Sequence, residues 1–260
     1  MYHQSSRYFF VSKNFFTIVY VVIVLLSFIF HNFLFLNVQV GLYKAQQKII
    51  SNRIFSEIKG YEKLETAYAY IYYTEKDQNY VNMIKQSIDF YYPLLRNDYG
   101  IVDSERIDVI LYASSAELSS VLPSKKDIYP MGAYYGGIIH ILSPRVWAGG
   151  YEDFSIKEKF MAEGPIVHEL SHLLLDKKTK GMYELWFTEG LALYYENKYI
   201  GFTWREDLKE VAQEISLEAL TKDFHKLDEA LAYRRAFDIV ADFVQKNGEK
   251  KLQSLIGAKP

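Results

Sequence analysis

An uncharged apolar run near the amino terminus constrains this chain of 260 residues more than any other feature of its sequence. No Lys, Arg, Asp or Glu occurs between Asn14 and Tyr43, and nearly every residue from Phe15 to Leu36 is apolar. Because about 20 residues suffice for a helix to cross the hydrocarbon core of a bilayer, the run predicts a transmembrane helix over residues 15–36. A cleaved signal peptide and a buried core helix are the alternatives, but a signal peptide has a shorter apolar region that ends at small residues.

The charges on either side of the run bear on its orientation. Arg7 and Lys13 precede it, and Lys44, Lys48 and Arg53 follow it, so the positive-inside rule does not decide strongly. A short basic tail before a first span usually stays in the cytoplasm, and we therefore expect an uncleaved, single-pass signal anchor in the cell membrane with the residues after 40 outside the cell. The predicted order is a tail (1–14), the signal anchor (15–36), a juxtamembrane stalk (37–60) and one folded domain (61–260).

Composition excludes several classes of protein. The chain has no cysteine, which rules out disulfides, thiolate metal sites and a cysteine nucleophile. The net charge of -2 gives no basic field, so we expect no nucleic-acid partner. Hydrophobic residues make up 50% of the chain and charged residues 24%, which is typical of a folded core. Nothing in the sequence indicates an oligomeric state.

Strand patterns come first in the predicted domain. Alternating and β-branched segments predict strands at 66–74 and 106–112, and a glycine-bearing turn that runs into a strand over Gly132 to Leu142. Helical spacing predicts a helix over 78–92, with Asp77 as its N-cap and an end near Pro93. A short helix is expected at 114–121, followed by a loop at 123–130.

Helical patterns dominate after Pro165, following a mixed stretch over 143–163 that is broken at Gly149-Gly150. We expect helices near 165–176, 184–198, 204–215, 229–246 and 249–256. Strands first and helices afterwards predict the α+β class, with a small mixed sheet followed by a helical half.

Two histidines four residues apart carry the strongest chemical signal, in His168-Glu169-Leu170-Ser171-His172. Positions i and i+4 share one face of a helix, so both imidazoles can reach one metal ion, and zinc prefers such nitrogen and oxygen ligands. Zinc lowers the pKa of a water to about 7, and Glu169 could accept the proton of that water. The competing interpretation is a buried polar pair satisfied by other side chains.

A third ligand is expected on a following helix. Glu189 lies in the otherwise apolar and small-residue stretch WFTEGLA at 186–192, where an unpaired buried carboxylate would be costly. Gly190 and Ala192 should allow this helix to approach the first one closely. Glu196 is the reserve candidate, and the competing interpretation is that Glu189 is a surface acid like Glu184 and Glu196.

HELSH, with Glu189 seventeen residues after His172, resembles the gluzincin metallopeptidases and most closely the compact peptidase MA-like family. The similarity extends over about residues 66–256, with its motifs at 166–175 and 186–194. The resemblance implies a zincin-like fold with one Zn²⁺ per chain held by His168, His172 and Glu189. It also implies that Glu169 is the general base.

The chain departs from the larger gluzincins at Leu193, where they often carry an aspartate that supports a histidine. We therefore expect the group that supports a histidine to come from elsewhere, from Asp176 or a backbone carbonyl. Tyr233 resembles a tyrosine found near this place in related sequences and could donate its hydroxyl to an oxyanion. His140 and His225 are weaker candidates, because a lone histidine is more often structural.

The expected function is that of a membrane-anchored zinc metallopeptidase, a hydrolase acting on a peptide or protein. Zincins commonly bind extended substrate along an edge strand, and Gly136 and Gly137 would let a peptide approach there. An ordinary hairpin strand explains the same residues equally well. One alternative function is a membrane-tethered zincin-fold binding or regulatory module with little or no turnover, and another is a zinc hydrolase that does not act on peptides.

Overall fold

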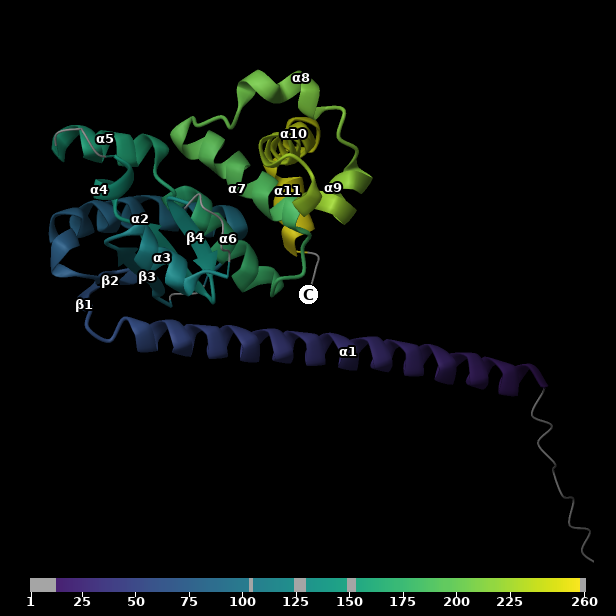
Figure 1. Ribbon diagram of the computed structural model, residues 1–260. Coiled ribbons are helices and arrows are strands. Elements are labelled where there is room, and N and C mark those ends of the chain that lie inside the picture. Colours follow the sequence, from purple (N-terminus) through teal and green to yellow (C-terminus); the bar gives the residue numbers. More distant parts are fainter. Residues whose placement is uncertain (1–12, 103–104, 124–129, 149–152, 258–260) are drawn as a thin grey trace, which may run out of the picture. The chain divides into compact units, whose positions relative to one another are not determined.

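The computed structural model describes residues 13–102, 105–123, 130–148 and 153–257 (Figure 1). The chain divides into two units, Met1–Ala45 and Gln46–Pro260. Most of the predicted tail (1–14) lies outside the described residues, as do most of the predicted loop at 123–130 and the Gly149-Gly150 break.

Helix α1 (Lys13–Glu57) contains the apolar run. It is long and apolar enough to cross a membrane, with a mean hydropathy of 2.3 in its most apolar window. The helix does not stop where the apolar run ends but continues through most of the predicted stalk. Because the compact unit begins at Gln46, the last turns of α1 belong to that unit.

A five-stranded mixed sheet forms the first half of the compact unit. Its strands are β1 (Glu62–Glu65), β2 (Ala69–Tyr73), β3 (Ile107–Tyr112), β4 (Gly132–Tyr135) and β5 (Ile138–Leu142). They are arranged in the order β1-β2-β3-β5-β4, and the central pairs β2/β3 and β3/β5 are parallel while the outer pairs are antiparallel. The strands predicted at 66–74 and 106–112 are thereby confirmed as β2 and β3.

The segment from Gly132 to Leu142 corrects the prediction of a turn leading into one strand. It is a hairpin, in which Gly136 and Gly137 form the turn between β4 and β5 with φ values of 64° and 80°. Residues with a side chain rarely adopt such angles, which explains the two glycines. One edge of the sheet is therefore β4, and Gly136 and Gly137 lie at the end of this strand rather than along it.

The two faces of the sheet are covered by different helices, because side chains alternate along each strand. Ile139 and Ile141 of β5 belong to the larger core, shared with α2 (Gln78–Tyr99) and α6 (Ile166–Thr179). Ile138 and Leu142 belong to a smaller core on the other face. That second core is shared with α3 (Ser115–Val121), confirmed where it was predicted, and with the end of α1 (Figure 1).

Helix α2 does not end near Pro93, which corrects the sequence prediction. It continues to Tyr99 with Pro93 inside it. Proline in a helix interior costs about 3 kcal/mol because it removes one hydrogen bond and clashes with the preceding turn. Leu95 and Tyr99 beyond it are completely buried, and this packing outweighs the local cost. The helix ends instead at Gly100, whose φ of 61° provides a left-handed cap.

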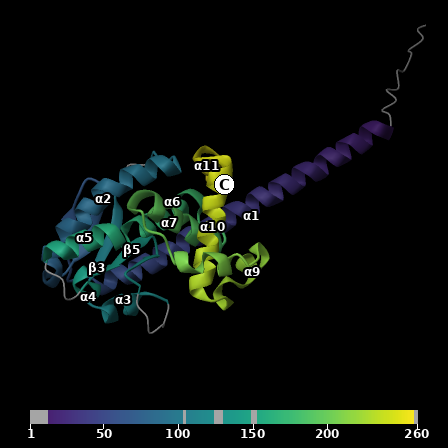
Figure 2. The ribbon, with the colours of Figure 1, turned by 90° about the horizontal axis from the view of Figure 1, so that it is seen from above.

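Helices fill the second half of the unit. They are α4 (Pro144–Trp147), α5 (Asp153–Glu163), α6, α7 (Leu185–Ile200), α8 (Lys209–Ala212), α9 (Leu217–Asp223), α10 (Glu229–Asn247) and α11 (Glu249–Gly257), with short 3-10 turns at Glu206–Leu208 and Phe224–Lys226. Of these, α4 and α5 lie in the mixed stretch over 143–163, and α9 was not predicted. Figure 2 shows α10 beside α7, with α11 next to it. The fold is mixed α+β with one small mixed sheet, as predicted at this level.

The packing of α1 in the compact unit gives a first prediction. Ile54 is 0% exposed beside Ile110, Tyr112 and Ile138, whereas Ile49 on the same helix is 71% exposed. We expect Ile54→Ala to cost about 2–5 kcal/mol, which lowers Tm by roughly 4 °C or more for a domain of this size. Thermal unfolding of the full-length protein in mild detergent measures this, with Ile49→Ala as the matched control. Equal and small effects of both changes would show that this part of α1 does not pack on the sheet.

Candidate metal centre

Helix α6 presents the two predicted histidines on one face. His168 and His172 are one turn apart, and their ring centroids are separated by 4.7 Å. The helix begins after Pro165, and the carbonyl oxygen of Pro165 accepts a hydrogen bond from the N–H of Glu169. Leu170, with its apolar neighbours on α6, is buried in the larger core. The apolar side of α6 therefore fixes the direction in which the histidines point.

Helix α7 brings Glu189 to both histidines. One carboxylate oxygen of Glu189, Oε2, lies 3.3 Å from Nε2 of His168 and 3.5 Å from Nε2 of His172. The ligand atoms of these three residues all lie within 4.8 Å of one another, and the group could hold a metal ion. Bonds of 2.0–2.2 Å around a tetrahedral ion separate neighbouring ligand atoms by roughly 3.3–3.5 Å. These two separations from Glu189 Oε2 therefore fit a shared cation.

Glu196 supports His168 from the opposite side of the imidazole ring. Its Oε2 lies 3.0 Å from Nδ1 of His168, so an N–H at Nδ1 can donate to it while Nε2 keeps its lone pair for a metal. The supporting group of His168 is thus Glu196, which the sequence did not suggest for this role, while Asp176 accepts a hydrogen bond from the Tyr134 hydroxyl at 2.6 Å. This geometry also separates the roles of Glu196 and Glu189, since only Glu189 faces both Nε2 atoms.

The buried charges of the cluster shift one another. Burial alone would raise the pKa of Glu189, but His172 and His168 lower that pKa well below the ordinary value of a glutamate. Burial alone would lower the pKa of His168, but Glu196 and Glu189 raise that pKa well above the ordinary value of a histidine. Without a metal, the cluster therefore favours a protonated imidazole beside carboxylates, and a bound cation would replace that proton.

Glu169 lies next to the two histidines in the sequence and is also buried. Burial raises the pKa of Glu169, and nearby Glu189 and Glu196 act in the same direction, while the histidines oppose them. The side chain passes close to the edge strand, because a Cβ atom added to Gly132 of β4 would lie 3.0 Å from Cγ of Glu169 and 2.6 Å from Cβ of Pro165. The absence of a side chain at Gly132 thus makes room for Glu169.

Tyr233 of α10 is brought to the same cluster, as the sequence suggested. Burial raises the pKa of its hydroxyl, and the neighbouring carboxylates of Glu189, Glu229 and Glu169 raise it further, Glu189 also through a hydrogen bond. A tyrosine held in this way stays protonated and can donate its O–H. The cluster therefore combines three candidate ligands, a buried carboxylate and a phenol.

No model of a known protein family matches this chain. No curated protein is significantly similar to it either.

The two weaker histidine candidates lie elsewhere. His140 of β5 points to the smaller core, on the sheet face opposite α6, where its Nδ1 lies 2.8 Å from the Tyr112 hydroxyl and its Nε2 lies 3.0 Å from the Tyr135 carbonyl oxygen. Burial lowers the pKa of His140 to about 4, so it is a neutral, hydrogen-bonded core residue. His225 is exposed in the 3-10 turn after α9.

Gly190 has a different neighbour from the one predicted. An added Cβ at this position would lie 2.4 Å from the carbonyl oxygen of Ala236 and 3.1 Å from Cγ2 of Val240, both on α10. Gly190 therefore permits close packing of α7 on α10 rather than on α6. Since α7 carries Glu189 and α10 carries Tyr233, this contact sets the spacing of those two side chains.

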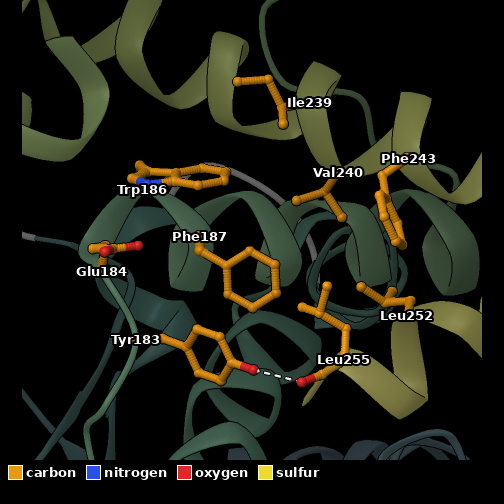
Figure 3. A pocket seen from close by; sticks show the side chains of 9 residues that line it. All are labelled: Tyr183, Glu184, Trp186, Phe187, Ile239, Val240, Phe243, Leu252 and Leu255. Carbon is orange, nitrogen blue, oxygen red and sulfur yellow. Dashed lines mark hydrogen bonds between the residues drawn. The ribbon is translucent and has the colours of Figure 1, made fainter. Parts of the chain in front are cut away.

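An apolar pocket of about 240 Å³ opens at the start of α7 (Figure 3). It is lined by residues of α7 and its approach, α10 and α11, namely Tyr183, Glu184, Trp186, Phe187, Ile239, Val240, Phe243, Leu252 and Leu255. None of the candidate metal ligands lines it. The Tyr183 hydroxyl donates to the carbonyl oxygen of Leu255 across its wall.

The geometry predicts an order of effects on metal affinity. Glu189→Ala removes a ligand atom, whereas Glu196→Ala removes only the partner of His168 Nδ1, which should cost roughly 10- to 100-fold in affinity. We expect a larger loss for Glu189→Ala and no loss for Glu184→Ala, an exposed acid at the start of the same helix. Competition between the full-length protein and a chromophoric chelator for Zn²⁺ or Co²⁺ measures all three. Equal losses for Glu189→Ala and Glu196→Ala would mean that the third ligand is wrongly assigned.

Proposed function

We propose that this protein is a membrane-anchored, zinc-dependent peptidase of the gluzincin type. The observation that carries the proposal is the meeting of His168, His172 and Glu189 at separations that suit one tetrahedral ion. Two imidazoles and one carboxylate are a ligand set of catalytic zinc sites, which keep the fourth position for water or substrate. A purely structural zinc site would close that position with a fourth protein ligand.

The residues around this position have complementary roles. A zinc ion held there would polarise a peptide carbonyl group and acidify a water molecule. Glu169 would accept a proton at its carboxylate and later give it to the leaving amine. Tyr233 would donate its hydroxyl to the oxygen that gains negative charge when the carbonyl carbon becomes tetrahedral. Glu196 would hold the ring of His168 in the orientation that directs Nε2 at the metal.

The edge of the sheet suggests how a polypeptide would bind. Among the strands that the structure describes, β4 is paired with β5 alone, and the backbone groups on its other side would suit an added strand. Gly132 at the start of β4 lies against Glu169. An extended peptide on β4 would thus pass the residue proposed as general base, which favours a polypeptide substrate.

The apolar part of α1 supports the membrane assignment within the proposal. The side chains of its apolar run are exposed from Tyr20 to Phe30, and eleven consecutive exposed apolar or small residues are unfavourable in water. We propose that this segment spans the cell membrane and that the compact unit lies outside the cell.

Two variants test the catalytic assignment together. We expect about one Zn²⁺ per chain in the purified full-length protein and none in His168→Ala, measured by metal analysis. Glu169→Gln should retain the zinc but lower peptide cleavage by roughly 10²- to 10⁴-fold, because it removes the general base. Zinc binding without cleavage of any peptide in a diverse library by the wild type would instead favour a binding module. Absence of zinc, with no rebinding, would contradict the metal site itself.

Gly132 provides a test of the edge strand. A methyl group at this position would collide with Pro165 and press on Glu169, so Gly132→Ala should reduce cleavage several-fold while the zinc content stays unchanged. Gly60→Ala is the matched control, because an added Cβ there meets no atom within 4 Å. Peptide hydrolysis and metal analysis of both variants measure this. Normal cleavage by Gly132→Ala would contradict substrate binding along β4.

A further inference from the structure

We infer that Trp204 is a positioning residue that clamps the ring of Tyr233, and that Arg234 fastens this clamp to α10. The inference rests on the proposed function, in which Tyr233 is the oxyanion donor, and names residues that hold it in place. Trp204 lies in the segment between α7 and α10, which includes the turn Glu206–Leu208, α8 and α9.

Two aromatic rings enclose Tyr233. The ring centroid of Trp204 lies 6.0 Å from that of Tyr233, and the centroid of Phe224 lies 5.6 Å from it, both in tilted arrangements. Contacts of this kind are worth about 0.5–1.5 kcal/mol each beyond the burial of area. Because the oxygen of a phenol lies in the plane of its ring, fixing the ring also fixes the position of that oxygen.

Trp204 is itself fixed to both helices that matter for the site. Its indole N–H donates to the carbonyl oxygen of Ala230 in the first turn of α10, at 3.2 Å. The preceding residue, Thr203, accepts a hydrogen bond from Asn197 of α7 at 2.8 Å. The segment therefore ties the helix of Glu189 to the helix of Tyr233 at the position of the clamp.

Arg234 of α10 binds the backbone of Trp204 through its guanidinium group. Its side chain is 1% exposed and donates to both carboxylate oxygens of Asp238, at 2.7 and 3.2 Å. It also donates to Glu206 at 2.6 Å and to the carbonyl oxygen of Trp204 at 3.0 Å. Burying an arginine is costly unless all its partners are in place, so a guanidinium with four such bonds defines the position of the Trp204 backbone sharply.

Backbone strain marks the same place. Arg205, between Trp204 and Glu206, has a φ of 41°, in the left-handed region that residues with a side chain avoid. Its guanidinium donates to both oxygens of Asp207 at 2.9 and 2.7 Å. Strained residues persist where the surroundings over-determine them, and they cluster at functional sites. The turn at Arg205 therefore adds a second, independent sign that the placement of Trp204 matters.

A double-mutant cycle tests whether Trp204 acts through Tyr233. We expect Trp204→Ala to lower kcat for peptide cleavage by roughly 10- to 100-fold with little change in KM or zinc content, since misplacing a catalytic group by about 1 Å costs this much. In a Tyr233→Phe background the same change should cost less than about twofold, because the hydroxyl that it positions is gone. Trp204→Phe, which keeps an aromatic ring, should retain part of the activity.

Trp147 offers a matched control. It is a part-buried tryptophan whose indole N–H donates to the carbonyl oxygen of Leu142 at 3.2 Å and whose ring lies 6.1 Å from that of Phe160. Trp147→Ala should therefore remove a similar set of contacts without the specific loss of kcat. An equal loss of kcat in both alanine variants, or an undiminished effect of Trp204→Ala in the Tyr233→Phe background, would overturn the inference.

A spectroscopic measurement decides the question even if turnover is absent. Fluorotyrosine placed at Tyr233 in the full-length protein gives a ¹⁹F signal that reports the surroundings of the ring. We expect this signal to shift and change in width in Trp204→Ala but not in Trp147→Ala, with zinc or without it. An unchanged signal in Trp204→Ala would overturn the clamp, whereas a changed signal in a protein that cleaves no peptide would leave the clamp standing and reject the proposed function.

Discussion

The burial of ionisable groups between α6 and α7 is the constraint on which the rest of the compact unit depends. Glu169, Glu189 and Glu196 are buried, and the side chains of His168 and His172 are 15% exposed. Each would be costly alone in an apolar interior, so each needs partners within a few tenths of an ångström of the right distance. Both helices are accordingly packed against neighbouring elements. The apolar side of α6 packs on the sheet, and the missing side chain of Gly190 allows α7 to lie against α10.

The short hairpin of β4 and β5 connects this centre with the end of α1. At one end of β4, an added Cβ on Gly136 would lie 2.5 Å from Ile50 of α1, and at the other end one on Gly132 would meet Pro165 and Glu169. Both close approaches require glycine, although for different reasons. Gly136 needs a positive φ as well as space, whereas Gly132 lies in an extended strand and needs space alone. The hairpin thus packs at one end of β4 on the last turns of α1 and at the other end on the proposed general base.

Local sequence patterns predicted the features of the structure that depend on the repeat of a single helix or strand. The spacing of His168 and His172, the apolar surroundings of Glu189 and the alternation in β2 and β3 follow from the periods of helix and strand, and the structure agrees with them. The prediction failed where distant packing decides. Pro93 signals a helix end, but burial of Leu95 and Tyr99 continues α2 through it. Gly190 signals a close approach, but only the fold shows that α10 is the neighbour. No sequence pattern predicted a positioning role for Trp204. That role is inferred from its neighbours in the structure, the strained backbone of Arg205 and the buried side chain of Arg234.

The carboxylate that supports His168 belongs to Glu196, seven residues after Glu189 on α7. Seven residues turn an α-helix by almost two full turns, so Glu196 shares the face of Glu189 but lies roughly 10 Å further along the axis. An aspartate at position 193, four residues after Glu189, would be nearer to Glu189 and would have a shorter side chain. Here Leu193 is buried at that position and contributes to packing instead. Glu196 reaches Nδ1 of His168 while Glu189 faces Nε2 of the same ring. The imidazole is therefore held between two carboxylates of α7, which add to the orientation that the packing of α6 gives to the His168 side chain.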